Sequence, residues 1–418
     1  MKKTLNPAWN LGLLMMAGHV SAAGFALVEQ SASGMGNAFA GAAAVAEDAS
    51  TIYFNPAGMV YLPDSQLVLA SHLLRTSGHF NNQGSTPGAN KPINGNGGDL
   101  GDIALLPNFY YAQSVTPNIR LGLGVSAPFG LKTEYDANWL GRFQAIKSDL
   151  KTININPSIA FKVNDRLSLG AGVSAMYIAT TLTRAVNFYP AGEGAVRVKG
   201  EDWGFGFNLG AMWQITPDTR FGMAYRSKIM QKLDGTAKFT RPPLVPAALA
   251  PDGDITANTT LPENFSLSAF SKINQQWDVM GDVTWTHWSR FKELRILKDN
   301  GTLFDVTPEN WKNTLRYSLG SNYHFNEKLK LRTGVAFDQE AINSQYRTAR
   351  IPGNDRTWLA LGAQYKINDS SIIDIAYSHL FIRDASINDN QTAKFNGRVK
   401  GVYNGDANIF SAQYTYNF

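Results

Sequence analysis

The segment Trp203–Ile215 reads WGFGFNLGAMWQI, and its residues alternate between two kinds of side chain. One face carries an apolar group at every second position, and the other carries mostly glycine, with Asn208, Met212 and Gln214. An alternation with a period of two is typical of a β-strand whose two faces meet different surroundings. The second face has no Lys or Glu, unlike the solvent face of a soluble sheet. The pattern is typical of a transmembrane barrel strand, which is apolar toward lipid and small and polar toward the lumen.

The same alternation recurs along most of the chain after residue 65. In Leu329–Phe337, for example, Lys330, Arg332 and Gly334 occupy one face while the other face is mostly apolar. We count about fourteen such segments, an even number as in bacterial barrels. The expected strands span residues 66–76, 103–113, 119–127, 150–163, 167–186, 203–215, 219–229, 263–273, 277–289, 313–325, 329–339, 356–367, 371–382 and 408–418. The sequence therefore predicts an all-β fold, a transmembrane antiparallel β-barrel.

The connections between these segments alternate in length. Short turns such as Thr216-Pro217-Asp218 follow one strand, and long loops such as residues 230–262 follow the next. Short turns on one side and long loops on the other indicate an outer-membrane barrel of a Gram-negative bacterium, with both termini on the periplasmic side. The last strand alternates aromatic residues and ends on Phe418, which resembles the assembly signal of outer-membrane barrels. We therefore expect the barrel assembly machinery to be a partner.

Composition excludes several classes of function. The 418 residues include 38 Lys+Arg against 33 Asp+Glu, a formal net charge of +5, and no cysteine. A chain without cysteine has no disulfide scaffold, thiol nucleophile or cysteine-ligated metal. Its cations are scattered singly, so nucleic acid is not an expected partner. The histidines lack metal-ligand spacing and no G-x-S-x-G motif occurs, so we expect no metal, no cofactor and no enzymatic activity.

Residues 1–22 have the pattern of a secretory signal peptide. Lys2 and Lys3 form a positive start, residues 11–20 form an apolar core, and Ser21-Ala22 ends a small-residue cleavage site. An N-terminal membrane helix is the alternative, although polar residues interrupt the uncharged stretch. An exported chain with no other apolar span of about 20 residues is a soluble periplasmic protein or a barrel. The alternation described above favours the barrel.

Residues 23–64 do not alternate and are rich in Gly, Ala and Ser. Small residues let a segment pack closely, and a barrel of about fourteen strands leaves a lumen that can be plugged. The apolar Phe25, Met35 and Phe39 argue against a polar, disordered tail. We therefore expect residues 23–64 to form an N-terminal hatch inside a barrel made of residues 65–418.

Several short motifs follow one another along the mature chain. They read Gly24-Phe25, Ser33-Gly34-Met35-Gly36-Asn37-Ala38, Asp48-Ala49-Ser50-Thr51, Asn55-Pro56-Ala57-Gly58, Trp139-Leu140-Gly141-Arg142-Phe143, Asp202-Trp203-Gly204-Phe205-Gly206, Thr333-Gly334-Val335-Ala336-Phe337-Asp338 and Ile351-Pro352-Gly353-Asn354-Asp355-Arg356. Over essentially the whole mature chain and in this order, they resemble the FadL-type family of outer-membrane transporters for long-chain fatty acids and other hydrophobic compounds. The resemblance implies passive transport through a monomeric barrel with a hatch.

A transported fatty acid needs a partner for its carboxylate. Parity with Ser168 and Ser174 places Arg184 on the inner face of its strand, and there it matches the pocket arginine of the family. Arginine binds carboxylates through two parallel hydrogen bonds, so we expect Arg184 to bind the head group. A structural ion pair with a lumen acid is the alternative. The family's second pocket base has no match in residues 301–312, which leaves open a channel for neutral hydrocarbons or monoaromatic compounds.

The loop 128–148 carries apolar side chains that could capture a hydrophobic ligand outside the cell. Large exposed apolar patches usually mark binding sites, although packing between loops is the alternative. The residues concerned are Phe129, Leu131, Trp139, Leu140 and Phe143. We expect them to form a landing surface.

The remaining expected site residues concern the gate. Pro56 lacks a donor and Gly58 is permissive, so Asn55-Pro56-Ala57-Gly58 predicts a kinked strand. The resemblance implies that Phe25 occupies the pocket, that Asp338 helps to hold that end of the hatch, and that a strand kink lets the ligand leave sideways. The expected function is thus capture of long-chain fatty acids on the loops, binding in the lumen, and lateral release into membrane lipid after the hatch rearranges. An outer-membrane lipid enzyme and a porin for polar solutes are the remaining alternatives.

Overall fold

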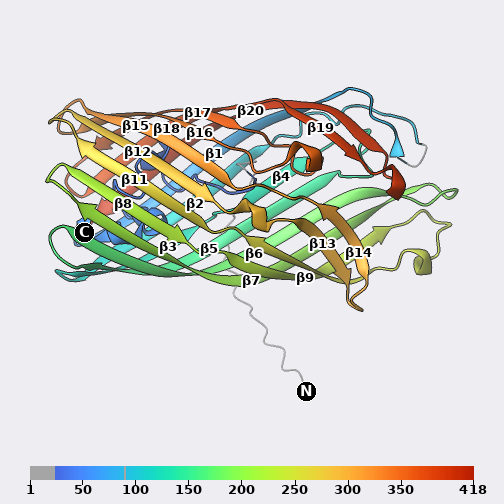
Figure 1. The fold of residues 1–418 in the computed structure, drawn as a ribbon, viewed down its shortest axis with the longest axis horizontal. Coiled ribbons are helices and arrows are strands. Elements are labelled where there is room, and N and C mark those ends of the chain that lie inside the picture. Colours follow the sequence, from blue (N-terminus) through green and yellow to red (C-terminus); the bar gives the residue numbers. More distant parts are fainter. Residues whose placement is uncertain (1–23, 89–90) are drawn as a thin grey trace, which may run out of the picture.

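The computed structural model describes residues 24–88 and 91–418, and the expected signal peptide lies outside them. Twenty strands form one antiparallel sheet that closes on itself (Figure 1). They are β1 (Ser65–Asn82), β2 (Ile103–Thr116), β3 (Ile119–Ser126), β4 (Gly130–Glu134), β5 (Lys147–Lys162), β6 (Leu167–Asn187), β7 (Glu193–Gln214), β8 (Thr219–Arg226), β9 (Ile229–Thr240), β10 (Gly253–Leu261), β11 (Asn264–Lys272), β12 (Trp277–Thr286), β13 (Glu293–Lys298), β14 (Leu303–Pro308), β15 (Thr314–His324), β16 (Leu329–Asp338), β17 (Arg356–Lys366), β18 (Ser371–Ile382), β19 (Ala385–Asn390) and β20 (Arg398–Asn417). Some of these strands continue a neighbour beyond a break, and the result is a closed barrel of 14 strands, as expected.

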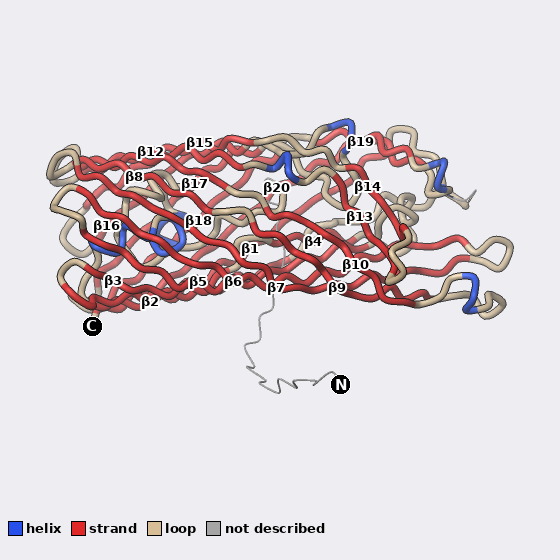
Figure 2. The backbone as a smooth tube through the Cα atoms, turned by 60° about the horizontal axis from the view of Figure 1, so that its bottom comes forward, coloured by secondary structure: helices blue, strands red, loops and turns tan. Residues whose placement is uncertain are grey.

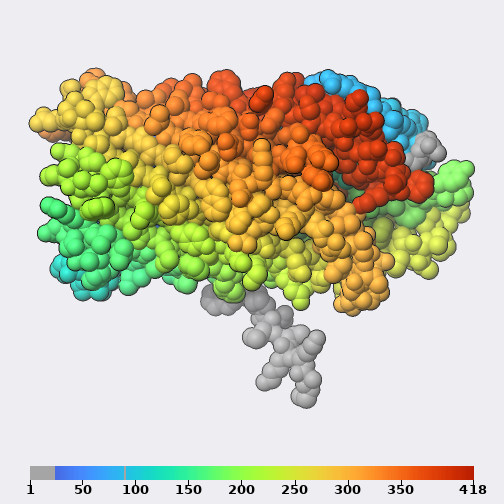
Figure 3. Space-filling view, in the orientation of Figure 1, coloured from blue at the N-terminus to red at the C-terminus, as the bar shows by residue number. Residues whose placement is uncertain are grey.

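The first and last strands close the barrel. β1 pairs with β20 without interruption from Gln66–Asn417 to Asn82–Gly401, and Figure 3 shows the blue and red parts of the chain in contact along one edge. The outward-facing side chains include Leu73, Phe205 and Leu319, which are strongly exposed in the isolated molecule. Each exposed apolar side chain of this size costs about 2 kcal/mol in water. Such a face is suited to lipid.

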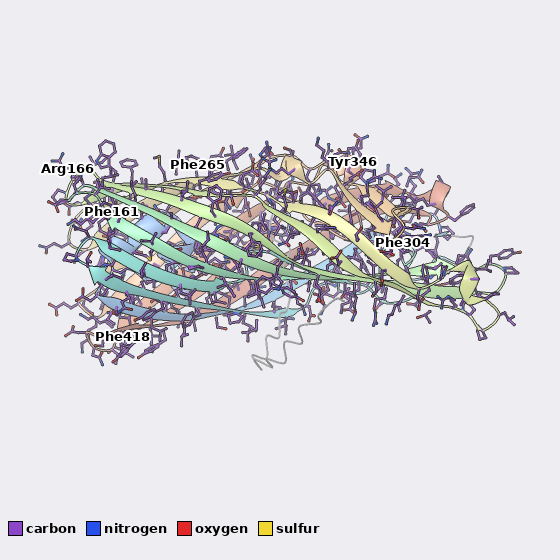
Figure 4. The ribbon with its side chains drawn as sticks, turned by 90° about the horizontal axis from the view of Figure 1, so that it is seen from below. Phe161, Arg166, Phe265, Phe304, Tyr346 and Phe418 are labelled. Atoms are coloured by element: carbon purple, nitrogen blue, oxygen red, sulfur yellow. The ribbon has the colours of Figure 1, made fainter. Side chains whose placement is uncertain are left out.

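The two ends of the barrel differ as the sequence predicts. Short turns and the C-terminus lie at one end of Figure 1, where Figure 4 also places Arg166 and Phe418, and long connections extend at the other end. Several expected loops are instead strand extensions, which include β9, β10, β13, β14 and β19. Outside the apolar band that faces lipid, the two strands of a hairpin stay hydrogen-bonded although their side chains are polar. In the sequence such polar strands look like loops, and their composition therefore predicts loops.

Residues 24–64 lie inside the barrel against its inner wall (Figure 2). Their helices are α1 (Ala32–Met35), α2 (Thr51–Phe54) and the 3-10 helix η1 (Pro56–Tyr61). The Asn37 side chain donates to the carbonyls of Ser321, at 3.0 Å, and Thr333, at 3.2 Å. The approach is so close that a Cβ on Gly334 would lie 2.2 Å from the Asn37 backbone. Glycines on the wall therefore let this segment touch the barrel backbone.

Short 3-10 helices occur in the long connections. They are η3 (Ala247–Leu249), η4 (Trp288–Arg290), η5 (Ser344–Tyr346) and η6 (Thr392–Lys394). Within the described residues, no helix combines the length and apolar character needed to cross a membrane.

Candidate functional site

An apolar cavity of ≈ 90 Å³ lies on the long-loop side of the lumen, and we call it the loop-side cavity. Alternate residues of one face of β6 line it, including Ile178, Thr180 and Leu182, because the side chains of a strand alternate. Its other lining residues are Phe25, Leu131, Ser148, Asp149, Leu150, Val198, Gly200, Leu233, Ile255, Ala257, Thr259, Leu261, Phe291, Leu294, Ile296, Glu309, Arg350 and Ile351. An alkyl chain fits such a lining, because each buried methylene contributes about 0.8 kcal/mol.

The loop-side cavity has a polar end made by Ser148, Glu309 and Arg350. The Arg350 guanidinium donates to the Ser148 hydroxyl at 3.3 Å and to the Lys147 carbonyl at 3.2 Å. Within the described residues no carboxylate forms an ion pair with it. Burial and the nearby Arg184 cation lower the pKa of Arg350 to about 10. Arg350 is therefore a cation at neutral pH, and its hydrogen bonds to Ser148 and Lys147 go to neutral oxygens.

Glu309 is buried, and its carboxylate accepts a hydrogen bond from the Trp311 indole at 2.9 Å. Burial raises the pKa of Glu309 to about 8, although the Trp311 hydrogen bond opposes this shift. At neutral pH most of the carboxyl is therefore protonated, and it can donate a hydrogen bond to an anion beside Arg350.

The expected carboxylate partner, Arg184, lies close to this polar end but is not part of the cavity lining. Its position in β6 has the same parity as Thr180 and Leu182, so it faces inward as predicted. The opposite charge that acts on it is Asp305. The structure thus supports the inward orientation, whereas Arg350 is the cation that the cavity presents.

Phe25 separates two cavities of the lumen. Its ring lies 4.9 Å from the Trp288 ring, 5.6 Å from Trp311 and 5.9 Å from both Phe129 and Phe291. Phe25 lines the loop-side cavity, and Trp288 lines a second cavity of ≈ 120 Å³, which we call the central cavity. The aromatic cluster therefore stands between them.

The central cavity lies between residues 26–56 and the strands β7, β8, β11, β12, β15 and β16. Its lining residues are Ala26, Leu27, Val28, Phe39, Ala42, Ala43, Tyr53, Phe54, Pro56, Asn208, Leu209, Ala224, Tyr225, Arg226, Asn264, Ser266, Asp282, Thr284, Thr286, Trp288, Thr314, Arg316 and Asp338. Asp338 stands between Arg316 and Arg356 in the register of three neighbouring strands. At Gly24, where the described part of the N-terminal segment begins, the backbone amide donates a hydrogen bond to the Glu340 carboxylate at 3.1 Å.

The barrel wall has a gap beside the N-terminal segment. β3 ends at Ser126 and its continuation β4 starts at Gly130, so the strand breaks at Ala127-Pro128-Phe129. β2 pairs with β3 only from Phe109 onward, while β4 pairs with β5. Within the described residues, no ladder joins the start of β2 to β4. A Lys132–Asp102 ion pair spans the two edges.

The N-terminal segment closes this gap from inside. Ala26 forms an antiparallel bridge with Phe129, the Leu27 amide donates to the Pro128 carbonyl at 2.7 Å, and the Gly130 amide donates to the Phe25 carbonyl at 2.9 Å. At the break, the backbone therefore forms hydrogen bonds to the N-terminal segment in the lumen, where a neighbouring strand would otherwise pair with it.

The prediction of a kinked strand at Asn55–Gly58 is wrong. Pro56, Ala57 and Gly58 start the 3-10 helix η1, and the Asn55 side chain caps it by accepting from the Ala57 amide. Proline is favoured at the start of a helix, where its missing donor costs nothing. The strand break lies at Pro128, where the same property of proline interrupts a ladder.

The predicted exposed landing surface is also wrong for the residues chosen. Phe129 and Leu131 pack around Phe25 and the loop-side cavity. Trp139 and Leu140 pack with Phe80 and Tyr403, and Phe143 is also buried. This is the packing between loops that the sequence left open. Large apolar side chains are exposed at other loop tips, namely Tyr189, Leu244, Leu249 and Phe395.

Sequence reasoning gave no site role to Arg350, Glu309 or Arg226, although Arg226 lies in the motif Ala224-Tyr225-Arg226-Ser227 of the resemblance. Arg350 directly precedes the motif Ile351–Arg356, so the motif marked the region but not the residue. Glu309 lies within residues 301–312, the region in which the resemblance implies a second pocket base, and this residue is an acid. In the described part of the chain, no three His, Asp or Glu side chains gather as metal ligands.

Comparison with known proteins assigns the chain to a family. The family described as outer membrane protein transport protein (OMPP1/FadL/TodX) matches residues 13–418. Outer membrane protein P1 of Haemophilus influenzae is 32% identical over 100% of both chains. The long-chain fatty acid transport protein of Escherichia coli is 28% identical over 95% of this chain and 94% of its own.

Solved structures agree with this relationship. The crystal structure of a Pseudomonas aeruginosa FadL homologue has a TM-score of 0.87 and 27% identity, over 94% of this chain and 99% of that one. The Ralstonia pickettii toluene transporter TbuX shares the fold at a TM-score of 0.69 and 20% identity, over 93% and 98%. This chain therefore belongs to the OMPP1/FadL/TodX family of outer-membrane proteins, which transport hydrophobic compounds.

Proposed function

We propose that the protein passively transports long-chain fatty acids across the outer membrane as a monomer. The observation that carries this proposal is the polar end of the loop-side cavity, where the Arg350 cation lies beside Ser148 and Glu309 and forms no ion pair with a carboxylate of the described residues. A neutral hydrocarbon needs no cation at the end of its cavity, and a buried cation is costly unless an anion meets it. An alkyl chain with a carboxylate head uses both parts of the cavity.

Capture and release complete the proposed path. The exposed Leu244 and Leu249 of residues 241–252 offer an apolar contact outside the membrane. From the loop-side cavity the ligand passes the Phe25 cluster and leaves through the wall gap at Pro128 into membrane lipid. Because Ala26 bridges to Phe129 across that gap, the N-terminal segment has to move for the ligand to leave.

The head-group site is tested by uptake of labelled oleate into cells that lack their own fatty acid transporter. We expect Arg350→Gln to reduce uptake by about tenfold or more, since a charge-assisted arginine–carboxylate contact contributes roughly 1.5–3 kcal/mol. Arg184→Ala tests the arginine predicted from sequence. Arg295→Gln is the matched control, because Arg295 pairs with Glu293 on the face of β13 opposite to the cavity-lining Leu294 and Ile296.

The outcomes separate the alternatives. Unchanged uptake in both Arg350→Gln and Arg184→Ala contradicts the head-group site. Oleate uptake by neither wild type nor variants, together with toluene uptake by wild type, supports the channel for neutral or monoaromatic compounds instead.

Movement at the gap is tested with a reversible bond. The chain has no cysteine, so Ala26→Cys with Phe129→Cys creates a single disulfide between residues that already face each other. We expect the oxidised protein to lose oleate uptake and the reduced protein to regain it. Equal uptake in both states contradicts release through this gap.

A further inference from the structure

The central cavity contains two buried arginines without a carboxylate partner. Arg226 and Arg316 are 7% and 8% exposed, and neither forms an ion pair to a carboxylate of the described residues. By contrast, the equally buried Arg332 has the Glu47 and Asp374 carboxylates at 2.6 Å and 2.7 Å. Buried charges are normally paired, because an unpaired charge in a low dielectric is costly. The unpaired arginines therefore indicate a position for an anion.

Arg226 is the stronger of the two candidates. Its guanidinium lies 4.4 Å above the Tyr53 ring and donates to the Tyr53 carbonyl at 2.7 Å and the Ser174 hydroxyl at 3.2 Å. Its neighbours in the barrel register are the neutral Asn208 and Asn264. Two nitrogens thus hold the guanidinium in place, while Nε makes no hydrogen bond to the described residues.

The two acids that line the cavity, Asp282 and Asp338, both interact electrostatically with Arg316. Asp282 accepts hydrogen bonds from Ser268 at 2.5 Å and Thr284 at 2.8 Å. Asp338 stands beside Arg316 in the register and attracts it electrostatically. The negative charge of the cavity therefore gathers around Arg316, and the Arg226 end is left positive.

The central cavity also lies on a route between the loop-side cavity and the wall gap. Trp288 lines it on the side of the Phe25 cluster, and Leu27 lines it on the side where its amide bonds to Pro128. Its volume of ≈ 120 Å³ is close to that of cavities of about 150 Å³ that bind benzene. Apolar side chains of Val28 and Phe54 line the same space.

We propose that the central cavity is a second carboxylate-binding site, in which Arg226 receives the head group of an amphiphile after it leaves Arg350. This inference rests on the proposed function, because it requires a fatty acid to enter the lumen. Arg350 lies on one side of the apolar Phe25 cluster and Arg226 on the other. The carboxylate therefore has a charged partner before and after it passes that cluster.

The site is tested with 2-bromohexadecanoate, whose bromine lies next to the carboxylate. We expect crystals of the full-length protein with this ligand to show anomalous density beside both Arg350 and Arg226. In Arg226→Gln we expect the second density to disappear while the first remains. Maximal uptake of hexadecanoate should fall about tenfold with half-saturation unchanged, because the lost contact is a charge-assisted one after the first site.

A second variant keeps the arginine and blocks its site. Asn264 stands opposite Arg226 in the register, so Asn264→Asp supplies an internal carboxylate and should lower maximal uptake as Arg226→Gln does. The matched control is Arg197→Gln, because Arg197 is exposed on the neighbouring strand β7 and does not line the cavity. Its uptake should equal that of wild type.

Each outcome decides the proposal. Bromine beside Arg350 alone, with uptake unaffected in Arg226→Gln and Asn264→Asp, overturns the second site and leaves fatty acid transport intact. Bromine beside Arg226 without any effect of the two variants shows binding at crystal concentration only, and also overturns it. Absence of both densities and of uptake by wild type removes the proposed function itself.

Discussion

At the scale of single residues, the loop-side cavity places a protonated acid beside a cation. Burial raises the pKa of Glu309 to about 8 from 4.5, whereas Arg350 keeps its charge with a pKa of about 10. Because the pKa of Glu309 is raised in the folded state, its contribution to stability is complete below about pH 4.5 and is lost as the pH rises through about 8. Ligand binding should follow the same direction, since an ionised Glu309 repels an anionic head group.

We therefore predict that binding of hexadecanesulfonate weakens between pH 7 and pH 9, by about tenfold for each unit of induced pKa shift. This ligand stays ionised throughout, so only the protein titrates. Quenching of tryptophan fluorescence reports binding, because Trp311 bonds to Glu309. Glu309→Gln should lose the pH dependence, whereas Glu293→Gln should keep it, because Glu293 lies on the face of β13 opposite to the cavity-lining Leu294. A pH dependence that persists in Glu309→Gln contradicts the assignment.

At the scale of elements, an ion cluster joins the N-terminal segment to the wall. Arg332 of β16 bridges Glu47 of the segment and Asp374 of β18, and Lys330 reaches Glu47 at 2.8 Å. Burial by itself raises the pKa of Glu47, but Arg332 and Lys330 lower it to about 2. A lowered carboxyl pKa contributes stability above pH 4.5 that is lost as the pH falls toward 2.

We predict that Arg332→Gln loosens residues 24–64 while the barrel stays closed. The substitution leaves the buried Asp374 carboxylate without its cation, which costs roughly 3–5 kcal/mol, and it leaves Glu47 with Lys330 alone. Hydrogen exchange should show faster exchange in residues 24–64 and little change in β1 and β20. Lys366→Gln is the control, because Lys366 and Asp369 form an exposed pair in a turn. If residues 24–64 exchange at the wild-type rate in Arg332→Gln, the cluster does not anchor them.

At the scale of the whole molecule, closure of the barrel depends on pairing between its first strand, β1, and its last strand, β20. The Phe418 amide donates to the Ser65 carbonyl at 3.0 Å, and its ring lies 4.9 Å from the Tyr416 ring. The Phe418 side chain is 69% exposed at the short-turn end. It contributes little packing in the folded protein, which fits the proposed role in recognition by the barrel assembly machinery.

We predict that Phe418→Ala lowers the amount of folded barrel in the outer membrane, with uptake per folded molecule unchanged. Heat-dependent mobility of the barrel on gels measures the folded fraction. Phe395→Ala serves as the control, since Phe395 is an equally exposed phenylalanine at a loop tip. An equal folded fraction in Phe418→Ala and wild type contradicts the role of Phe418 in assembly.

The sequence by itself determined the barrel, because a strand with two faces records both environments in its own alternation, as Trp203–Ile215 does. It could not locate the strand break, because proline interrupts a ladder at Pro128 but starts a helix at Pro56, and only the packing decides between these uses. The alternation predicted that Arg184 faces inward. It did not predict the cavity, because the cavity is lined by side chains from segments that are far apart in the sequence. Arg350 and Glu309 lie 41 positions apart in sequence, and only the closed barrel brings both to the end of one apolar cavity.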